Sequence, residues 1–318
     1  VTSVGAKVGL LKTIKSSTDI GTVVGIDCDP WASGSIGCDH FEVVEELESP
    51  QYLARLESLC QQYSIGLIIP TREADMRILV PWAKNHTRAI ATSSLETLDL
   101  CQNKVNTYQW LSQRGFPVAP WVQWRHQDPI SLESIIGPLP WFSKDPQGRG
   151  SIGCQRIEQA SHLQAIPDGW ILQPHLSGQE YTLNGYVDRC GKCHALIPHA
   201  RLRVSGGEVS HGVTVRDNML IDLGRRVIEA LPGAYGPINM QVFWNRHTHQ
   251  IAITDINPRL GGGYPLSHAS GGKFVQWLAW EALGRPLPEN AQHTWQDQVR
   301  LLGYRDTHIA FPVEASLS

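Results

Sequence analysis

The stretch ITDINPRLGGGYPLSHASG, Ile253–Gly271, carries the densest chemical signal in the sequence. Asp255 and Asn257 stand two residues apart on a predicted strand, so their side chains face the same side. Two hard oxygen ligands on one face suit Mg²⁺, and Arg259 continues that face and can clamp a phosphate. The glycines that follow permit close backbone approach. The stretch therefore predicts a strand that ends in a site for a metal ion and an anion.

The composition excludes several classes of protein. The chain has 318 residues, which suggests about two domains, and its apolar fraction of 42% excludes intrinsic disorder. A net charge of −3 gives no basic excess for nucleic acid, and no apolar run approaches the ~18 residues of a membrane span. The scattered cysteines and the absence of a secretory signal predict a cytoplasmic protein. The sequence does not open with Met, so residues before Val1 could be missing.

The first hundred residues alternate short apolar runs with helical patterns. The runs VVGID, LIIPT and RAIAT begin at Val23, Leu67 and Arg88, and an amphipathic pattern from Tyr52 separates the first two. Short apolar strands separated by helices indicate βαβ units and a buried parallel sheet. We therefore expect an α/β, Rossmann-like domain over residues 1–98.

The remaining residues, 99–318, change in pattern. The segment LETLDLCQNKVNTYQWLSQRG, from Leu95, predicts one helix that ends near Gly115. Between 171 and 256, five strand-like runs with turn signals at 189–192 and 245–249 predict a largely antiparallel sheet. A late helix is predicted from Phe274. We expect this part to be of the α+β class.

Two motifs of the first domain have more than one interpretation. The turn SVGAKVG, residues 3–9, could hold an anion with Asp27 on a ribose, or could be an ordinary tight turn. Thr71, Arg72, Glu73 and Asp75 follow a parallel strand, where ligand crevices form. The acids would suit an amino group and the arginine a carboxylate. The same four residues also fit a helix N-terminus with acids in its first turn.

The motif CGKCH, Cys190–His194, has the spacing of a haem attachment site or of half a zinc knuckle. It lies between two strand-like runs, and no second cysteine pair accompanies it. We interpret it as a β-hairpin turn.

The motifs occur along the chain in the order of the ATP-grasp superfamily, which the sequence resembles. They are CQNKVNTYQWL from Cys101, WFSKDPQGRGSIG from Trp141, ILQPHLSGQEYTLNGY from Ile171, HARLRVSGGEVSHGVTVRD from His199 and Ile253–Gly271. The chain looks most like the stand-alone ligases that are similar to half of the carbamoyl-phosphate synthase large subunit. The resemblance implies a Rossmann-like domain and a two-lobed ATP-grasp fold, with a lid lobe at about 116–175 and a large lobe at about 176–318.

The resemblance implies a set of nucleotide contacts. Two lysines would reach the ATP phosphates, and the loop 148–153 would close over them. The hinge would bind adenine through the N–H of Leu176 and the carbonyl of Pro174, where the family usually has Glu. Glu180 would bind the ribose hydroxyls. The full nucleotide-binding set is Lys104, Lys144, Gly148, Gly150, Ser151, Gln173, Pro174, Leu176 and Glu180.

The resemblance also implies a metal site formed by Gln241, Asp255 and Asn257. Relatives mostly have Glu at the Asp255 position, and Gln241 is neutral, so the site carries one formal negative charge. We expect Mg²⁺, with Mn²⁺ as a possible substitute, to bind mainly together with ATP.

The reacting groups would lie beside this site. Arg201 and Arg259 would stabilise the transferred phosphoryl group. His211, where relatives often have Lys, could assist phosphate transfer or take the proton of the amine, or could be a solvated loop histidine. Glu208, Ser210 and Gly262 are further substrate candidates.

The leading functional hypothesis is an ATP- and Mg²⁺-dependent carboxylate–amine ligase that works through an acyl phosphate and releases ADP and phosphate. The alternatives are bicarbonate activation like that of carbamoyl-phosphate synthase, and a non-catalytic ATP-binding regulatory protein. A NAD-dependent dehydrogenase would leave Ile253–Gly271 unexplained. The expected partners are a small carboxylate and an amine, without nucleic acid or membrane, and a homodimer is possible.

Overall fold

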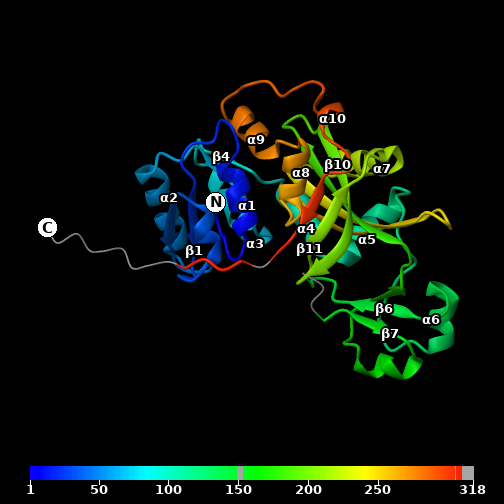
Figure 1. Ribbon diagram of the computed structural model, residues 1–318. Coiled ribbons are helices and arrows are strands. Elements are labelled where there is room, and N and C mark those ends of the chain that lie inside the picture. Colours follow the sequence, from blue (N-terminus) through cyan, green and yellow to red (C-terminus); the bar gives the residue numbers. More distant parts are fainter. Residues whose placement is uncertain (149–152, 305, 310–318) are drawn as a thin grey trace.

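The computed structural model describes residues 1–148, 153–304 and 306–309 (Figure 1). An N-terminal part, a large central sheet and a small projecting lobe can be followed in the ribbon. Within the described residues, no helix is both long and apolar enough to cross a membrane.

The N-terminal part is an α/β arrangement with parallel strand pairs. β1 pairs with β2 and β3 pairs with β4, in each case parallel. Thr2 forms parallel bridges to Ile26 and Pro70 and so joins the two pairs. The predicted Rossmann-like parallel arrangement is confirmed. Its elements are α1 (Val8–Lys15), β1 (Val24–Asp27), η1 (Ser33–Gly37), β2 (His40–Val43), α2 (Tyr52–Gln62), β3 (Leu67–Ile68), α3 (Glu73–Ala83) and β4 (Ala89–Ile90).

The single helix predicted from Leu95 is wrong, because the segment forms two helices. These are α4 (Leu95–Gln102) and α5 (Lys104–Gln113). Asn103 between them is extended, and its side chain accepts the N–H of Val105 at 2.9 Å. Asparagine favours this N-cap geometry over the helix interior. The break places Lys104 at the first position of α5.

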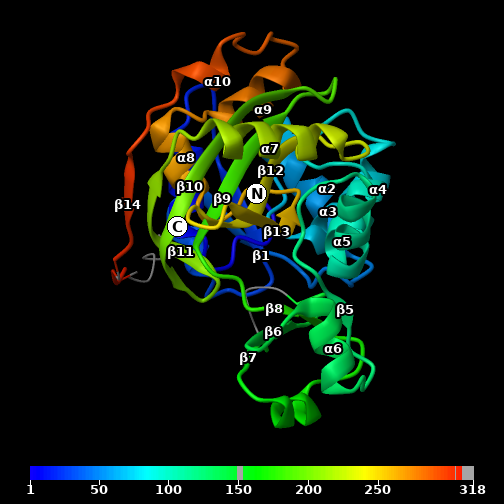
Figure 2. The same ribbon diagram turned by 90° about the vertical axis from the view of Figure 1, so that its right-hand side faces the viewer.

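The small lobe contains a four-stranded antiparallel sheet in the order β5-β8-β6-β7 (Figure 2). Its own apolar core includes Trp124, Leu132, Trp141 and Ile157. The elements are β5 (Val122–Gln123), α6 (Pro129–Ile136), β6 (Trp141–Lys144), β7 (Gln155–Ile157), η2 (Ala160–Ala165) and β8 (Ile171–Pro174).

The central sheet has the order β13-β12-β9-β10-β11-β14, and all its neighbouring strands are antiparallel as predicted. Leu196 packs into the core that includes α7, whereas Ala195 and Ile197 face the core shared with α8, α9 and the N-terminal part. The elements are β9 (Gln179–Val187), β10 (Cys193–Ser205), β11 (Glu208–Thr214), α7 (Asn218–Ala230), β12 (Gly236–Asn245), β13 (Gln250–Asn257), α8 (Tyr264–Ser270), α9 (Phe274–Ala282), α10 (Ala291–Thr294) and β14 (Arg300–Leu302).

The CGKCH motif is the predicted hairpin turn between β9 and β10. The Asp188 carboxylate accepts the backbone N–H groups of Cys190 and Lys192, both at 2.9 Å. Gly191 has a φ of +81°, which favours glycine. Cys190 is exposed and Cys193 is buried, so the two thiols do not form a shared metal site.

Asp75 and Thr71 hold the chain start between the two strand pairs. The Thr2 and Ser3 hydroxyls donate to the Asp75 carboxylate at 2.8 and 2.9 Å.

We predict that Asp75→Ala lowers the free energy of unfolding by about 2–3 kcal/mol, because buried hydroxyls lose a charged acceptor. Chemical denaturation measures the change. Asp222→Ala, at an exposed position of α7, is the control. Equal losses of stability in the two variants would contradict the role of Asp75 in holding the chain start.

Candidate functional site

One face of the central sheet changes from apolar to polar along its strands. Side chains two residues apart share a face, so Tyr186 and Ile197 belong to the buried end, and Thr182 and Arg201 lie further along the same face. The register places Gln241 opposite Asp255 and Asn239 opposite Asn257 on β12 and β13. The sheet thus gathers polar groups from four strands at one place.

The first of two adjoining cavities at this face is called the hinge cavity here. It has a volume of about 240 Å³ and lies between the central sheet and the small lobe. Phe142, Leu176 and Phe243 give it an apolar end, and Lys104 and Lys144 give it a cationic end. Such a lining suits a flat apolar group that carries a chain of negative charges.

Lys144 is buried, with 6% of its surface exposed. Burial lowers the pKa of its ammonium to about 8, and the charge of Lys104 acts in the same direction. The ammonium donates to the hydroxyl of Tyr108 and lies 4.9 Å from the centre of that ring. The Tyr108 hydroxyl in turn donates to the Thr254 carbonyl at 3.0 Å. A fixed, desolvated lysine therefore faces the hinge cavity.

Lys104 links three parts of the fold. Its ammonium donates to the Gly148 carbonyl at 2.7 Å and lies 3.8 Å from an oxygen of Asp255. Its backbone N–H donates to Pro146 at 2.8 Å. Gly150 and Ser151, predicted in the adjoining loop, lie outside the described residues.

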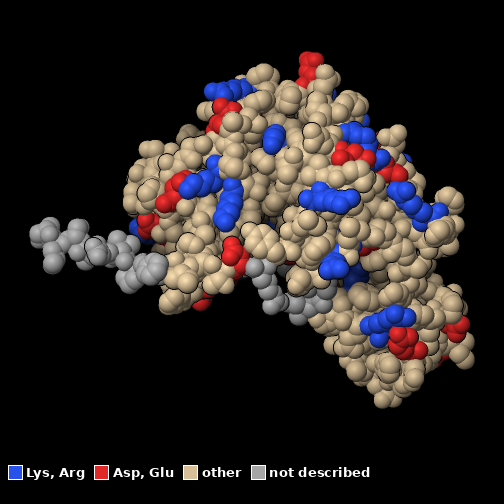
Figure 3. Space-filling model, in the orientation of Figure 1, with Lys and Arg blue, Asp and Glu red and all other residues tan. Residues whose placement is uncertain are grey.

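The second cavity, called the polar cavity, has a volume of about 160 Å³. It shares Lys104, Gly148, Arg201, Gln241 and Asp255 with the hinge cavity, so the two open onto common side chains. Its other lining residues include the predicted Glu73, Glu208, Asn257, Arg259 and Gly262. The side of the molecule drawn in Figure 3 carries scattered charges of both signs, and a hollow lies between the small lobe and the body of the molecule.

Asp255 and Gln241 line both cavities, and Asn257 lines the polar cavity beside them. The Asn257 amide nitrogen donates to Asp255 at 3.1 Å, which leaves the amide oxygen of Asn257 directed away from that bond. In the described part of the chain, no cluster of three or more His, Cys, Asp or Glu side chains is arranged to hold a metal. The donor set therefore fits an oxygen-seeking cation that takes most of its ligands from another anion.

Arg201 and Glu180 form a half-buried pair. The Arg201 Nε lies 3.2 Å from a Glu180 oxygen, and a second guanidinium nitrogen donates to the Gly207 carbonyl at 2.9 Å. Burial raises the pKa of Glu180, and Arg201 opposes that shift. The pair holds a carboxylate and a guanidinium at the edge of the hinge cavity.

Several predicted residues lie away from the two cavities. Thr71 donates to the carbonyls of Thr2 and Ser3 at 3.0 and 2.7 Å, and Asp75 accepts from the hydroxyls of the same two residues, so both hold the chain start. Asp75 lies in the first turn of α3, and the N-cap of that helix is Arg72. Arg72 is exposed before α3. Ser210 and His211, on β11, do not line either cavity.

The predicted hinge residues divide between two neighbouring cavities. Gln173, Leu176 and Glu180 line the hinge cavity, and Pro174 lines a groove that shares Leu176 and Phe243 with it. Pro174 pairs with Trp141 in the β8–β6 ladder. Asp27, the ribose candidate of the first turn, accepts the N–H of Gly5 at 2.8 Å and so stabilises the turn itself.

Sequence reasoning missed residues that act through tertiary contacts. Lys7 donates to the Ser3 carbonyl at 3.1 Å. Burial lowers its pKa, the charge of Glu208 opposes that shift, and the charge of Arg259 adds to it. Asn239 donates to the carbonyls of Asn257 and Arg259 and so fixes the end of β13. Neither belongs to a local motif, and no sequence signal identified them.

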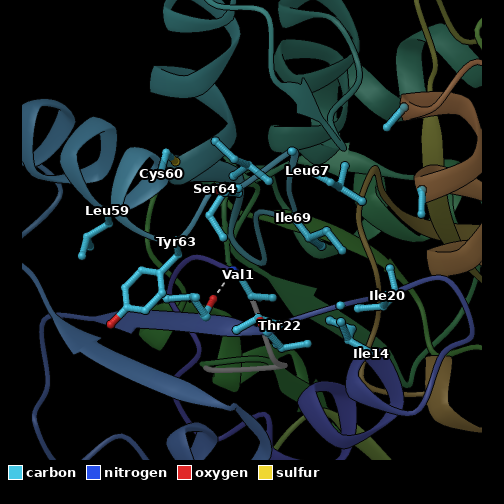
Figure 4. Close-up of a pocket in the computed structure, with 18 of the residues that line it drawn as sticks. Val1, Ile14, Ile20, Thr22, Leu59, Cys60, Tyr63, Ser64, Leu67 and Ile69 are labelled. Atoms are coloured by element: carbon cyan, nitrogen blue, oxygen red, sulfur yellow. Dashed lines mark hydrogen bonds between the residues drawn. The ribbon is translucent and has the colours of Figure 1, made fainter.

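A separate apolar cavity of about 470 Å³ surrounds Val1 in the N-terminal part (Figure 4). Ile14, Ile20, Leu67 and Ile69 line it, and Asp19 is its one acidic lining residue. None of the predicted site residues lines it. It lies in a different part of the fold from the hinge and polar cavities.

Two family descriptions match the chain. Residues 1–93 match the PylC-like N-terminal domain, and residues 167–305 match the ATP-grasp domain in the biosynthetic pathway with the Ter operon. A search of curated proteins gave no match.

Solved structures share the fold at low sequence identity. Biotin carboxylase from Campylobacter jejuni has a TM-score of 0.71 at 15% identity, over 92% of this chain and 72% of that one. N5-carboxyaminoimidazole synthetase from Staphylococcus aureus, complexed with ADP, has a TM-score of 0.70 at 15% identity, over 90% of this chain and 77% of that one. The biotin carboxylase domain of 2-oxoglutarate carboxylase from Hydrogenobacter thermophilus was solved with MgADP and bicarbonate. Its TM-score is 0.71 at 14% identity, over 94% of this chain and 72% of that one. At these identities the likeness shows a shared fold, and the match to an ATP-grasp family covers residues 167–305.

The glycine-rich segment after β13 gives a test of the site's packing. A Cβ added at Gly263 would lie 2.6 Å from the fully buried His199 ring, whereas one at Gly262 would meet only the end of Glu208. We predict that Gly263→Ala lowers the free energy of unfolding by about 1–3 kcal/mol, because the ring has no room to move. Gly262→Ala should change it by less than about 0.5 kcal/mol. Denaturant titration of both variants measures the difference, and similar values would refute this packing.

Proposed function

We propose that the protein is an ATP- and Mg²⁺-dependent carboxylate–amine ligase that forms an acyl phosphate and releases ADP and phosphate. One observation carries the proposal. The hinge cavity, with an apolar end and two lysines, shares Lys104, Arg201 and Asp255 with the polar cavity. A nucleotide in the first and a charged substrate in the second would therefore meet at these side chains.

The hinge cavity accounts for the parts of ATP. Adenine would lie between Phe142 and Phe243, with the backbone at Leu176 along its edge. Glu180 would accept hydrogen bonds from the ribose hydroxyls. Lys144 and Lys104 would bind the phosphates, and the desolvated position of Lys144 strengthens that attraction.

Gln241 and Asp255, which line both cavities, and Asn257, which lines the polar cavity, would hold Mg²⁺. Bound there with ATP, the ion would neutralise phosphate charge and orient the γ-phosphate. A single carboxylate fits an ion that arrives with the nucleotide. Mn²⁺ prefers similar oxygen ligands and would be able to replace it.

The reaction follows from these positions in two displacements. A substrate carboxylate oxygen attacks the γ-phosphorus in line, the bond to the β-phosphate oxygen breaks, and ADP leaves. Arg201 and Arg259 stabilise the charge on the transferred group. The amine then attacks the acyl carbon, phosphate leaves, and the amine's proton passes to solvent or a nearby base. No side chain forms a covalent bond in this scheme.

Bicarbonate activation is the second candidate. The polar cavity is small, and the similar structure from H. thermophilus was determined with bicarbonate and MgADP. In that case the first acceptor of the phosphoryl group would be bicarbonate, and carboxyphosphate would replace the acyl phosphate.

ADP and phosphate release with MgATP, across pools of carboxylates and amines, tests the proposal. We expect turnover that requires one member of each pool and falls at least about 100-fold in Asp255→Asn, because the only formal charge of the metal site is removed. Asp222→Asn on the surface of α7 is the matched control.

Three other outcomes contradict the ligase proposal. Turnover with bicarbonate as the sole carboxylate would favour bicarbonate activation. ATP binding without turnover on any pool would favour a regulatory role. Full activity of Asp255→Asn would remove the metal site from the mechanism.

Lys144 predicts a pH dependence of nucleotide binding. Its ammonium is charged below its pKa of about 8 and neutral above it. We expect the affinity for MgATP to fall as the pH rises through this value, by up to about tenfold per pH unit. Fluorescence titration between about pH 7 and pH 9 measures it. Lys144→Met should bind more weakly and lose this slope, and Lys192→Met, on the β9–β10 turn, should keep it. An unchanged slope in Lys144→Met would assign it to another group.

A cytoplasmic location and a homodimer remain predictions from the sequence and its resemblance. Fractionation of the native protein and light scattering of the purified chain test them.

A further inference from the structure

Tyr108 is a buried residue to which the proposed reaction gives no role. Its side chain is 2% exposed, and it lies on α5 one helical turn after Lys104. The centre of its ring is 5.8 Å from that of Trp121, in the segment that leads into β5 of the small lobe. Tyr108 therefore lies where the small lobe joins the body of the molecule.

The Tyr108 hydroxyl connects the two lobes by a chain of hydrogen bonds. It accepts from the Lys144 ammonium on β6 and donates to the Thr254 carbonyl on β13 at 3.0 Å. The Gln173 amide oxygen on β8 is a second neighbour at 3.4 Å. A hydroxyl has one hydrogen, so the nearer carbonyl receives it. A cation of the small lobe is thus tied to the strand that carries Asp255.

Tyr108 gives Lys144 most of its polar contact within the described residues. Besides the hydroxyl, the ammonium has the Thr254 carbonyl at 3.5 Å, and it lies 4.9 Å from the centre of the Tyr108 ring. A Phe at position 108 would keep the ring and its packing on Trp121. It would leave the ammonium only the more distant carbonyl, so the side chain of Lys144 would be held less firmly.

We propose that Tyr108 is a positioning residue for the nucleotide: its hydroxyl holds the Lys144 ammonium of the small lobe in the place where phosphate groups bind. This inference rests on the proposed function in placing the phosphates beside Lys144. A cation that is already fixed loses less conformational freedom when its ligand arrives, so binding is tighter. Phe142 and Phe243 line the other end of the hinge cavity, so the hydroxyl acts on the phosphates and not on the base.

Tyr108→Phe tests the inference through two ligands. MgATP is titrated into the full chain by calorimetry, and the affinity for adenosine is measured from its displacement of MgATP. We expect the variant to bind MgATP about tenfold more weakly, because a hydrogen bond to a charged group is lost. The affinity for adenosine should stay within about twofold of that of the parent protein.

Tyr186→Phe is the matched control. Its hydroxyl donates to Glu281 at 2.5 Å in the core between the central sheet and α9, away from both cavities. This variant also loses a hydrogen bond of a buried tyrosine. We expect it to keep the parent ratio of MgATP affinity to adenosine affinity, whatever its stability.

A double-mutant cycle tests whether Tyr108 acts through Lys144. Lys144→Met removes the ammonium that the hydroxyl holds. Adding Tyr108→Phe to Lys144→Met should then change the affinity for MgATP by less than about twofold, since the two side chains act as one unit. A further tenfold loss in the double variant would overturn the inference.

The outcomes separate this inference from the proposed function. MgATP binding that depends on Tyr108, without ADP release on any pool of substrates, would support the inference and contradict the ligase. ADP release together with an unchanged MgATP affinity in Tyr108→Phe would support the ligase and overturn the inference. Equal losses of MgATP and adenosine affinity would also overturn it. Absence of MgATP binding by the parent protein would contradict both.

Discussion

The antiparallel register of four strands is the constraint on which the site depends. Side chains on a strand alternate between faces, so a shift of one residue would exchange the two faces. The pairing of Gln241 with Asp255, and of Asn239 with Asn257, places their side chains together. Arg201 and Glu180 join them from β10 and β9. Apolar residues further along the same strands pack into the core and hold the strands in that register. The packing at one end of the strands therefore fixes which polar side chains meet at the other end.

The arrangement of charge explains why this face suits polyanions. Burial lowers the pKa of Lys144, and the charge of Lys104 acts in the same direction. Asp255 lies 3.8 Å from the Lys104 ammonium and offsets part of this charge. A desolvated ammonium group gains free energy when a phosphate group enters beside it. Tyr108 accepts a hydrogen bond from Lys144, and Gly148 accepts one from Lys104. These two bonds hold the ammonium groups in place.

Local sequence accounts well for residues that lie on regular strands. Asp255, Asn257 and Arg259 were predicted to share a face, and the structure places all three at the polar cavity. Prediction was weaker where a residue has two compatible uses. Thr71 and Asp75 fit both a crevice and a helix start, and neither pattern predicts the hydrogen bonds that they form with Thr2 and Ser3. The break at Asn103 was also missed, because capping competes with a helical pattern that is otherwise continuous.

The sequence by itself determined the strand and helix classes, the hairpins and the chemical types at the ends of the strands, because these depend on periodicity and on residues close in the chain. Tertiary structure alone decided which charges meet. Lys7 lies near Glu208 and Arg259, and Glu73 shares a cavity with Arg259, although long stretches of chain separate them. Such contacts depend on how the N-terminal part packs against the central sheet. No local pattern encodes that packing, since it results from apolar burial summed over many residues.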